Sequence, residues 1–566
     1  MTYHQATTHP LMLVLLLALS GPARGEFNVV EAGIADMQQA MASGRTTSRE
    51  LVQQYLMRIA LYDKKLNAVM AVNPNVLREA EERDRERAQG RLRGPLHGIP
   101  IAVKDNVHTT DMPTTGGALA FEGFVPPYEA TLVKNLREAG AVIIAKTGMT
   151  ELANWVAGAP TPMPSGYNAI GGFGMTPYDP RRDQRYAAYD GRPVLSPGGS
   201  SSGIGTAANF WAANVGTETS GSLLSPANNT MLVSIKPTVG RISRYGVIPI
   251  TADQDTAGPI ARTVADAAIL FGALEDAQAD PQDPVKPCPP PPNRDYTPFL
   301  NRDALAGARI GIPRAFFYEP VAVPGFQQWQ GGLSPAQAQA MLEAIAVLKQ
   351  RGAVIVDPAD IPSVIDPDAS NNFLRWDICR GADGAKGNDA SCSVVFKYGM
   401  KRDFNKWLAS LGPRAPVRSL TELRLWNLAH ANAGALRYGQ SQLDISDEMD
   451  VDADRARYEG DRARDIALSA THGIDEIMRR ERLDALLFPG VYGAALLARA
   501  GYPTVIVPFA TVPNAPFPPL PQGFDAEPSP FGVSFSGGAC SEPRLIALAY
   551  AFEQATKRRV PPASAP

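Results

Sequence analysis

The sequence has no marked excess of either charge. Its 54 basic and 57 acidic residues leave a formal net charge of −3 at pH 7, and no polybasic stretch occurs. Binding to nucleic acid or to an anionic membrane surface would require clustered positive charge. We therefore expect a small-molecule or peptide partner, and no nucleic acid.

Cysteine and histidine are scarce, with four and six residues. No CxxC or Cys/His pair has the spacing of a zinc site, and no GK[ST] loop or GxGxxG between strand and helix occurs, so we expect no metal and no cofactor. The cysteines, which allow three pairings, are Cys288, Cys379, Cys392 and Cys540. Cys379 and Cys392 flank a Gly- and Asp-rich stretch. They are the favoured local disulfide, and free buried cysteines are the alternative.

An apolar run long enough to cross a bilayer is missing. The run at 11–20 (LMLVLLLALS) is too short to span, but it suits the apolar core of a secretory signal, and small residues follow it. Residues 1–25 are therefore predicted to be a signal peptide, which implies a secreted or periplasmic protein without a stable membrane anchor. The alternative is an ordinary helix behind a wrongly assigned start.

Short apolar strands alternate with helices along the chain. Residues 99–103 are predicted to form a buried strand, and 131–145 a helix, a glycine and a strand, a pattern that 342–356 repeats. Strands that are apolar on both sides belong to a sheet with both faces covered. The prediction is an α/β fold, in which one large domain (26–566) has a central mixed β-sheet covered by helices on both faces. The more charged range 301–480 is expected to form a helical subdomain over the active site.

The region richest in glycine and serine is 196–222 (SPGGSSSGIGTAANFWAANVGTETSGS). Its Phe210 and Trp211 argue against a flexible linker. A serine hydroxyl is a weak nucleophile until a neighbouring base removes its proton. A buried lysine can be that base, because burial disfavours its charged form. Lys104 is the candidate, since it directly follows the apolar run GIPIAV.

Several segments, in the same order, resemble the amidase-signature family. They are GIPIAVKDN (98–106), PGGSSSG (197–203), GTETSGS (216–222), the stretch 234–268 and the closing segments GYPTVIVPFA and 530–556. The resemblance extends over 27–562. It implies the amidase-signature fold and the hydrolysis of amide bonds through a Ser-cisSer-Lys triad and an acyl-enzyme. The wording of GTETSGS is most similar to amidases that act on peptide C-terminal amides, and other carboxamides remain open.

The resemblance also assigns roles to single residues. Lys104 becomes the base, Ser200 the serine that passes the proton, and Ser222 the nucleophile. The oxyanion hole is assigned to the backbone N–H groups of Thr219, Ser220, Gly221 and Ser222. Substrate contacts are assigned to Met149, Tyr167 and Ser201, and the support of the serine loop to Asp255.

The sequence departs from the family in two places. Ser200 and Ser222 are two residues closer together than is usual, and we place the deletion in the helix between them, near 204–206. Ser201 and Ser202 therefore stay open as alternatives for the bridging serine. Ser220 stands where many relatives have Asp or Gly, which is tolerable because the contacts there come from the backbone.

Other functions fit parts of the sequence. The GSSSG at 199–203 also matches the GxSxG elbow of an α/β-hydrolase-like esterase, with Ser201 as nucleophile and His472 as base, but no HGGG-type segment occurs. The amidase-signature family also includes the glutaminase subunit of tRNA-dependent amidotransferases, against which the predicted export argues. The presence of all three triad residues disfavours a non-catalytic binding protein.

Overall fold

The computed structural model describes residues 27–185, 190–199, 202–285, 287–516 and 518–566. The predicted signal peptide and the two serines Ser200 and Ser201 lie outside the described residues. No helix in the described part is both long and apolar enough to cross a membrane.

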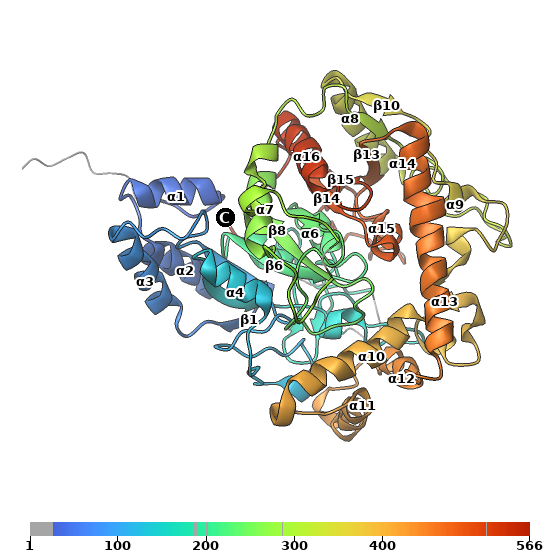
Figure 1. The fold of residues 1–566 in the computed structure, drawn as a ribbon, viewed down its shortest axis with the longest axis horizontal. Helices are drawn as coiled ribbons and strands as arrows, with labels where there is room; N and C mark the ends of the chain where they lie inside the picture. The colour runs from blue at the N-terminus through green and yellow to red at the C-terminus, as the bar shows by residue number, and fades with distance from the viewer. Residues whose placement is uncertain (1–26, 186–189, 200–201, 286, 517) are drawn as a thin grey trace, which may run out of the picture.

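The core of the fold is a mixed sheet of eleven strands (Figure 1). Both ends of the sheet contain parallel pairs, β3-β2-β6 and β13-β9-β10, and antiparallel pairs join them in the middle. In order across the sheet the strands are β1 (Val69–Val72), β3 (Val142–Thr147), β2 (Pro100–Lys104), β6 (Ala213–Glu218), β8 (Thr256–Ala261), β7 (Val233–Lys236), β14 (Thr504–Val512), β15 (Ser529–Ser536), β13 (Ala485–Pro489), β9 (Arg309–Gly311) and β10 (Val354–Val356).

Helices cover both faces of this sheet (Figure 1). Helix α7 packs on β7 and β8 and contacts α4 and α16, while α6 packs on β7, β14 and β15. The helices around the sheet are α1 (Ile34–Ala42), α2 (Ser48–Leu66), α3 (Val76–Ala88), α4 (Thr131–Glu138), α5 (Gly203–Ala207), α6 (Leu224–Asn229), α7 (Val264–Leu274), α8 (Pro335–Gln350), α15 (Ala494–Ala500) and α16 (Glu542–Thr556). The predicted α/β fold with a covered mixed sheet is confirmed.

Local sequence signals explain where several elements begin and end. Helix α2 starts at a capping box, in which the Thr47 hydroxyl accepts from the Glu50 N–H and the Glu50 carboxylate accepts from the Thr47 N–H. Strand β2 is buried along its whole length, as its unbroken apolar run predicts, and it ends on Lys104. Helix α4 ends just before the chain turns at Gly140, which has a positive φ.

The range 301–480 contains two kinds of structure. Its first part joins the main sheet through β9 and β10, with α8 between them. The rest is mainly helical and packs on the segment around Trp155 through a second hydrophobic cluster that includes Phe396, Trp407 and Leu443. Its helices are α9 (Pro362–Ile365), α10 (Val395–Ser410), α11 (Leu420–Ala429), α12 (Ser441–Asp447), α13 (Arg455–Ile466), a π-helical stretch (Ala467–Ile474) and α14 (Asp475–Glu481).

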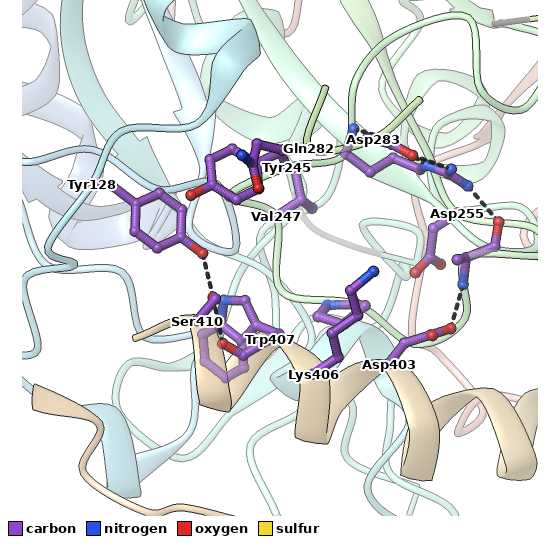
Figure 2. A pocket seen from close by; sticks show the side chains of 14 residues that line it. Tyr128, Tyr245, Val247, Asp255, Gln282, Asp283, Asp403, Lys406, Trp407 and Ser410 are labelled. Carbon is purple, nitrogen blue, oxygen red and sulfur yellow. Dashed lines mark hydrogen bonds and ion pairs between the residues drawn. The ribbon is translucent and has the colours of Figure 1, made fainter. Parts of the chain in front are cut away.

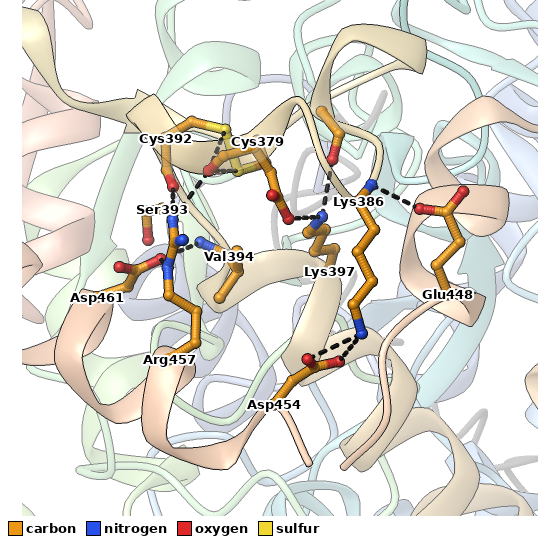
Figure 3. A network of polar contacts seen from close by, with 12 residues as sticks. Cys379, Lys386, Cys392, Ser393, Val394, Lys397, Glu448, Asp454, Arg457 and Asp461 are labelled. Atoms are coloured by element: carbon orange, nitrogen blue, oxygen red, sulfur yellow. Dashed lines mark hydrogen bonds and ion pairs between the residues drawn. A yellow bond between two sulfur atoms is a disulfide. The ribbon is translucent and has the colours of Figure 1, made fainter.

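Two disulfides pair all four cysteines. The predicted local pair Cys379–Cys392 is confirmed, and it lies beside the ion pair between Lys397 and Asp389, 2.6 Å apart (Figure 3). The second disulfide, Cys288–Cys540, joins the proline-rich loop after α7 to the segment before α16 across 252 residues of sequence. The alternative of free cysteines is therefore wrong.

Candidate active site

Two neighbouring parallel strands bring the candidate catalytic segments together. Val103 of β2 pairs with Val215 of β6, so that both strands end at the same edge of the sheet. Lys104 is the last residue of β2, and the chain beyond β6 turns at once into the segment that carries Ser222. The two most specific motifs of the sequence thus meet because the sheet aligns them.

Lys104 is fully buried. Its side-chain nitrogen donates to Thr217 of β6, at 2.9 Å to the hydroxyl oxygen and 3.2 Å to the carbonyl oxygen. Burial lowers the pKa of Lys104 to about 7, although the negative charges of Asp255 and Glu218 act in the opposite direction. A large share of an amine with this pKa is uncharged at neutral pH and can accept a proton, as a general base must.

Thr217 was not singled out by the sequence. Its hydroxyl oxygen accepts from the Lys104 amine and also from the Asn106 amide, at 3.0 Å. It therefore fixes the position of the lysine from the neighbouring strand. The signal that could have indicated it is its place in GTETSGS, at the end of a strand that pairs with the lysine strand.

The glycine-rich segment before Ser200 lies against the Ser222 side chain. A Cβ atom added to Gly199 would be 3.1 Å from the Ser222 hydroxyl oxygen, so this close approach requires glycine. The Gly199 carbonyl accepts from the Thr150 hydroxyl at 2.9 Å, and that hydroxyl in turn accepts from the Gly166 N–H at 2.8 Å. The described end of the bridging-serine motif and the nucleophile motif are thus adjacent. Thr150 is a further residue that the sequence did not indicate.

The turn that carries Ser222 is held from below by Glu218. One carboxylate oxygen of Glu218 accepts from the N–H groups of Leu223 and Leu224, at 2.7 and 3.1 Å. Gly221 has φ +91°, in the left-handed region that favours glycine, and its carbonyl accepts from the Ser225 N–H as α6 begins. The predicted oxyanion segment Thr219–Ser222 therefore forms a fixed, glycine-containing turn at the start of a helix.

Asp255 lies behind this turn and bonds to it. Its carboxylate accepts from the Thr219 hydroxyl at 2.5 Å and from the N–H groups of Ile250 and Thr251 at 2.8 and 2.9 Å. Burial raises the pKa of Asp255 to about 7, against the effect of these hydrogen bonds. The predicted supporting position of Asp255 beside the serine loop agrees with this geometry.

The two described residues assigned to substrate contact are both buried. The Met149 carbonyl accepts from the Asn168 amide, and the Tyr167 ring packs edge-on against Tyr438, with Arg437 over its face. Both lie close to the Thr150–Gly166 contact. Ser201, the third assignment, lies outside the described residues.

His472, the base of the alternative esterase, is held elsewhere. Its two ring nitrogens contact the carboxylates of Asp366 and Glu476, each at 2.9 Å, in the π-helical stretch before α14. Neither nitrogen is left to accept a serine proton. Within the described residues, no group of three or more His, Cys, Asp or Glu side chains is arranged to hold a metal ion.

Comparison with known proteins agrees with this geometry and defines an enzyme that hydrolyses amide bonds. The profile of the amidase family matches residues 50–546. A protein of Arabidopsis thaliana described as a probable amidase is 32% identical over 95% of this chain and 92% of its own. The chain belongs to the amidase family, whose signature the motifs around Lys104 and Ser222 carry.

The fold is shared over the whole length of a solved relative. The peptide amidase PAM, crystallised with the competitive inhibitor chymostatin, superimposes with a TM-score of 0.78 and 35% identity over 95% of this chain and all of the other. A component of the glutamyl-tRNA(Gln) amidotransferase of Synechococcus sp. is 30% identical over 92% of this chain and 96% of its own. Both comparisons support the predicted family.

Proposed function

We propose that the protein is an exported amidase that removes the C-terminal amide group of peptides, with Lys104, Ser200 and Ser222 as its triad. The observation that carries the proposal is the buried Lys104 amine, whose pKa is lowered to about 7 at the end of the strand beside the Ser222 turn. A lysine that must stay charged would be placed in water or beside a carboxylate within ion-pairing distance.

The proposed reaction has two halves. The neutral Lys104 amine takes a proton from Ser200, Ser200 takes one from Ser222, and the Ser222 oxygen attacks the amide carbon. The negative charge on the former carbonyl oxygen is stabilised by the N–H groups of the Thr219–Ser222 turn. The C–N bond then breaks, the relay returns a proton to the leaving nitrogen, and ammonia departs. Water hydrolyses the resulting ester and releases the peptide acid.

The choice of substrate rests on similarity to the peptide amidase PAM, which is 35% identical and binds the peptide-like inhibitor chymostatin. The amidotransferase component is similar at a lower identity, 30%. The helical part of 301–480, which packs beside the Met149–Tyr167 region, is proposed to shape the substrate pocket.

The export of the protein is proposed from two features. The apolar run at 11–20 has the character of a secretory signal, with residues 1–25 as the segment removed. Two disulfides support the proposal, because disulfides persist in oxidising compartments outside the cytosol. We accordingly place the mature protein outside the cell or in a periplasm.

The test measures ammonia release from a panel of peptide amides, matched methyl amides and free glutamine. Wild type should release ammonia from the peptide amides, and Ser222→Ala and Lys104→Ala should lose activity by at least about a thousandfold. Ser225→Ala, three residues further along, is the control and should keep full activity. Turnover of glutamine alone would refute the peptide-amide proposal, and full activity of Lys104→Ala would refute the triad. Peptide sequencing of the mature N-terminus from the secreted fraction tests export.

A further inference from the structure

A pocket of about 200 Å³ borders Asp255 but is lined by neither Lys104 nor Ser222 (Figure 2). Its walls come from the segment 244–255, from helix α10 and from Tyr128. The proposed hydrolysis gives this pocket no role, although one of its lining residues, Asp255, also bonds to the catalytic turn through Thr219.

Aromatic rings form one wall. Tyr128 and Tyr245 stack with their ring centroids 4.7 Å apart and their planes 13° from parallel. The Tyr128 hydroxyl bonds to Ser410, and the Trp407 indole N–H donates to His108 at 2.9 Å, so both rings are fixed from outside the pocket. Flat, fixed rings of this kind favour a second aromatic ring packed against them.

The charged side chains around the pocket are paired, with one exception. Arg244 is engaged by Asp283 at 2.6 Å, and Asp403 is engaged by Arg402 at 2.7 Å. Burial raises the pKa of Asp255 to about 7, which favours its uncharged form. Lys406 extends from α10 toward the space between Tyr245 and Asp255, and no ion pair or hydrogen bond to another described residue occupies its ammonium group (Figure 2).

We propose that this pocket binds a small aromatic carboxylate, with the ring against Tyr245 and Trp407 and the carboxylate on Lys406. The volume is below the range of about 300–1,000 Å³ that is typical for drug-sized ligands, so the occupant has a single ring. A carboxylate supplies the charge that Lys406 lacks. Through Asp255 and Thr219, this ligand is one hydrogen bond away from the catalytic turn.

Calorimetric titration with benzoate tests the chemistry of the site. Cyclohexanecarboxylate, which keeps the charge without the aromatic ring, and benzyl alcohol, which keeps the ring without the charge, should each bind more weakly. Lys406→Met should weaken benzoate binding by about tenfold, the value of one charge-assisted hydrogen bond. Lys349→Met removes an exposed lysine on α8 as a control and should leave binding unchanged. Equal affinities for Lys406→Met and wild type would overturn the proposal.

The position of the ligand is tested separately. Crystals soaked in 4-bromobenzoate should show the anomalous signal of bromine between Tyr245 and Lys406. A signal beside Ser222, or none, would overturn the proposal. Both measurements are made on wild type and on Ser222→Ala, so their outcome does not depend on the amidase reaction. Tyr245→Leu, which removes one ring of the stack, is a second variant that should weaken benzoate.

Discussion

The side-chain nitrogen of Lys104 lies 2.9 Å from the hydroxyl oxygen of Thr217, on the neighbouring parallel strand. The same oxygen accepts from Asn106, two residues beyond the lysine. One threonine therefore holds both the base and the residue that follows its strand. Strand β6 continues from this threonine into the turn of Ser222, so the distance between base and nucleophile is set within one pair of strands.

Thr217→Val should test this arrangement, because valine has nearly the shape of threonine but cannot accept a hydrogen bond. The lysine amine then keeps only the Thr217 carbonyl as a partner. We expect kcat on a peptide amide to fall by about tenfold to a hundredfold, as for a misplaced catalytic group, with little change in KM. Thr504→Val, on β14, is the matched control and should retain full kcat. An unchanged kcat for Thr217→Val would show that the contact is dispensable.

The pH dependence of kcat/KM should follow Lys104. Since the reaction needs the neutral amine, kcat/KM should rise with pH up to about 7 and level off above it. The Asp255 charge raises the pKa of Lys104, so Asp255→Asn should shift this rise to lower pH. The measurement is a pair of pH–rate profiles. Asp465→Asn, another buried carboxyl, is bonded to Trp376 and Ser393 and should leave the profile in place. A shift to higher pH in Asp255→Asn would contradict the assignment.

The sequence predicted the parts of the site that lie in one local segment. The apolar run before Lys104 is a strand, and the glycine-rich segment around Ser222 is a turn that opens a helix. Periodicity and motif wording carry this information because neighbouring residues determine both. The order of the eleven strands was not readable, since pairs such as β7 and β14 join segments about 270 residues apart.

The sequence did not predict contacts between distant segments. The role of Thr150 depends on Gly199 and Gly166 folding back onto it. Likewise, Cys288 and Cys540 are brought together only when the loop after α7 meets the segment before α16. The same holds for Asp255, whose raised pKa reflects burial by several elements rather than any feature of its neighbours in sequence.

Gly199→Ala should reduce catalysis without unfolding the protein. The added methyl group would lie 3.1 Å from the Ser222 hydroxyl oxygen and would push the nucleophile out of line. We expect kcat to fall by about a hundredfold, a typical cost of misplacing a reacting group by about 1 Å. Thermal unfolding should change little. Gly460→Ala, where an added methyl meets nothing within 4 Å, is the control and should keep full activity. Equal activity of the two variants would place the reacting serine elsewhere.

The two disulfides should differ in what they contribute to stability. In the chain-entropy description, the loss grows with the loop that the bond closes. Replacing Cys288 and Cys540 by serine, which opens a separation of 252 residues, should cost about 5 kcal/mol, and replacing Cys379 and Cys392, separated by 13, about 3 kcal/mol. Urea unfolding of the two double variants measures the difference. A larger loss from the short-loop pair would show that local contacts, and not loop closure, dominate.

His472→Gln should affect stability and leave the reaction intact. Burial alone would lower the pKa of His472, but its hydrogen bonds to Glu476 and Asp366 raise the pKa above the ordinary value of 6.5. A raised histidine pKa stabilises the folded state fully below pH 6.5, and this contribution is lost as pH rises through the folded pKa. Urea unfolding should therefore show wild type more stable than His472→Gln at about pH 5, with the difference shrinking toward about pH 8.

The control for this prediction is His430→Gln. His430 stacks on Trp426 and bonds to its carbonyl, with no carboxylate contact among the described residues, so its replacement should give no pH-dependent difference. Amide hydrolysis at neutral pH should be the same in both variants and in wild type, because neither histidine belongs to the Lys104 site. A loss of hydrolysis in His472→Gln at full stability would instead make His472 a catalytic base and would restore the esterase-like alternative.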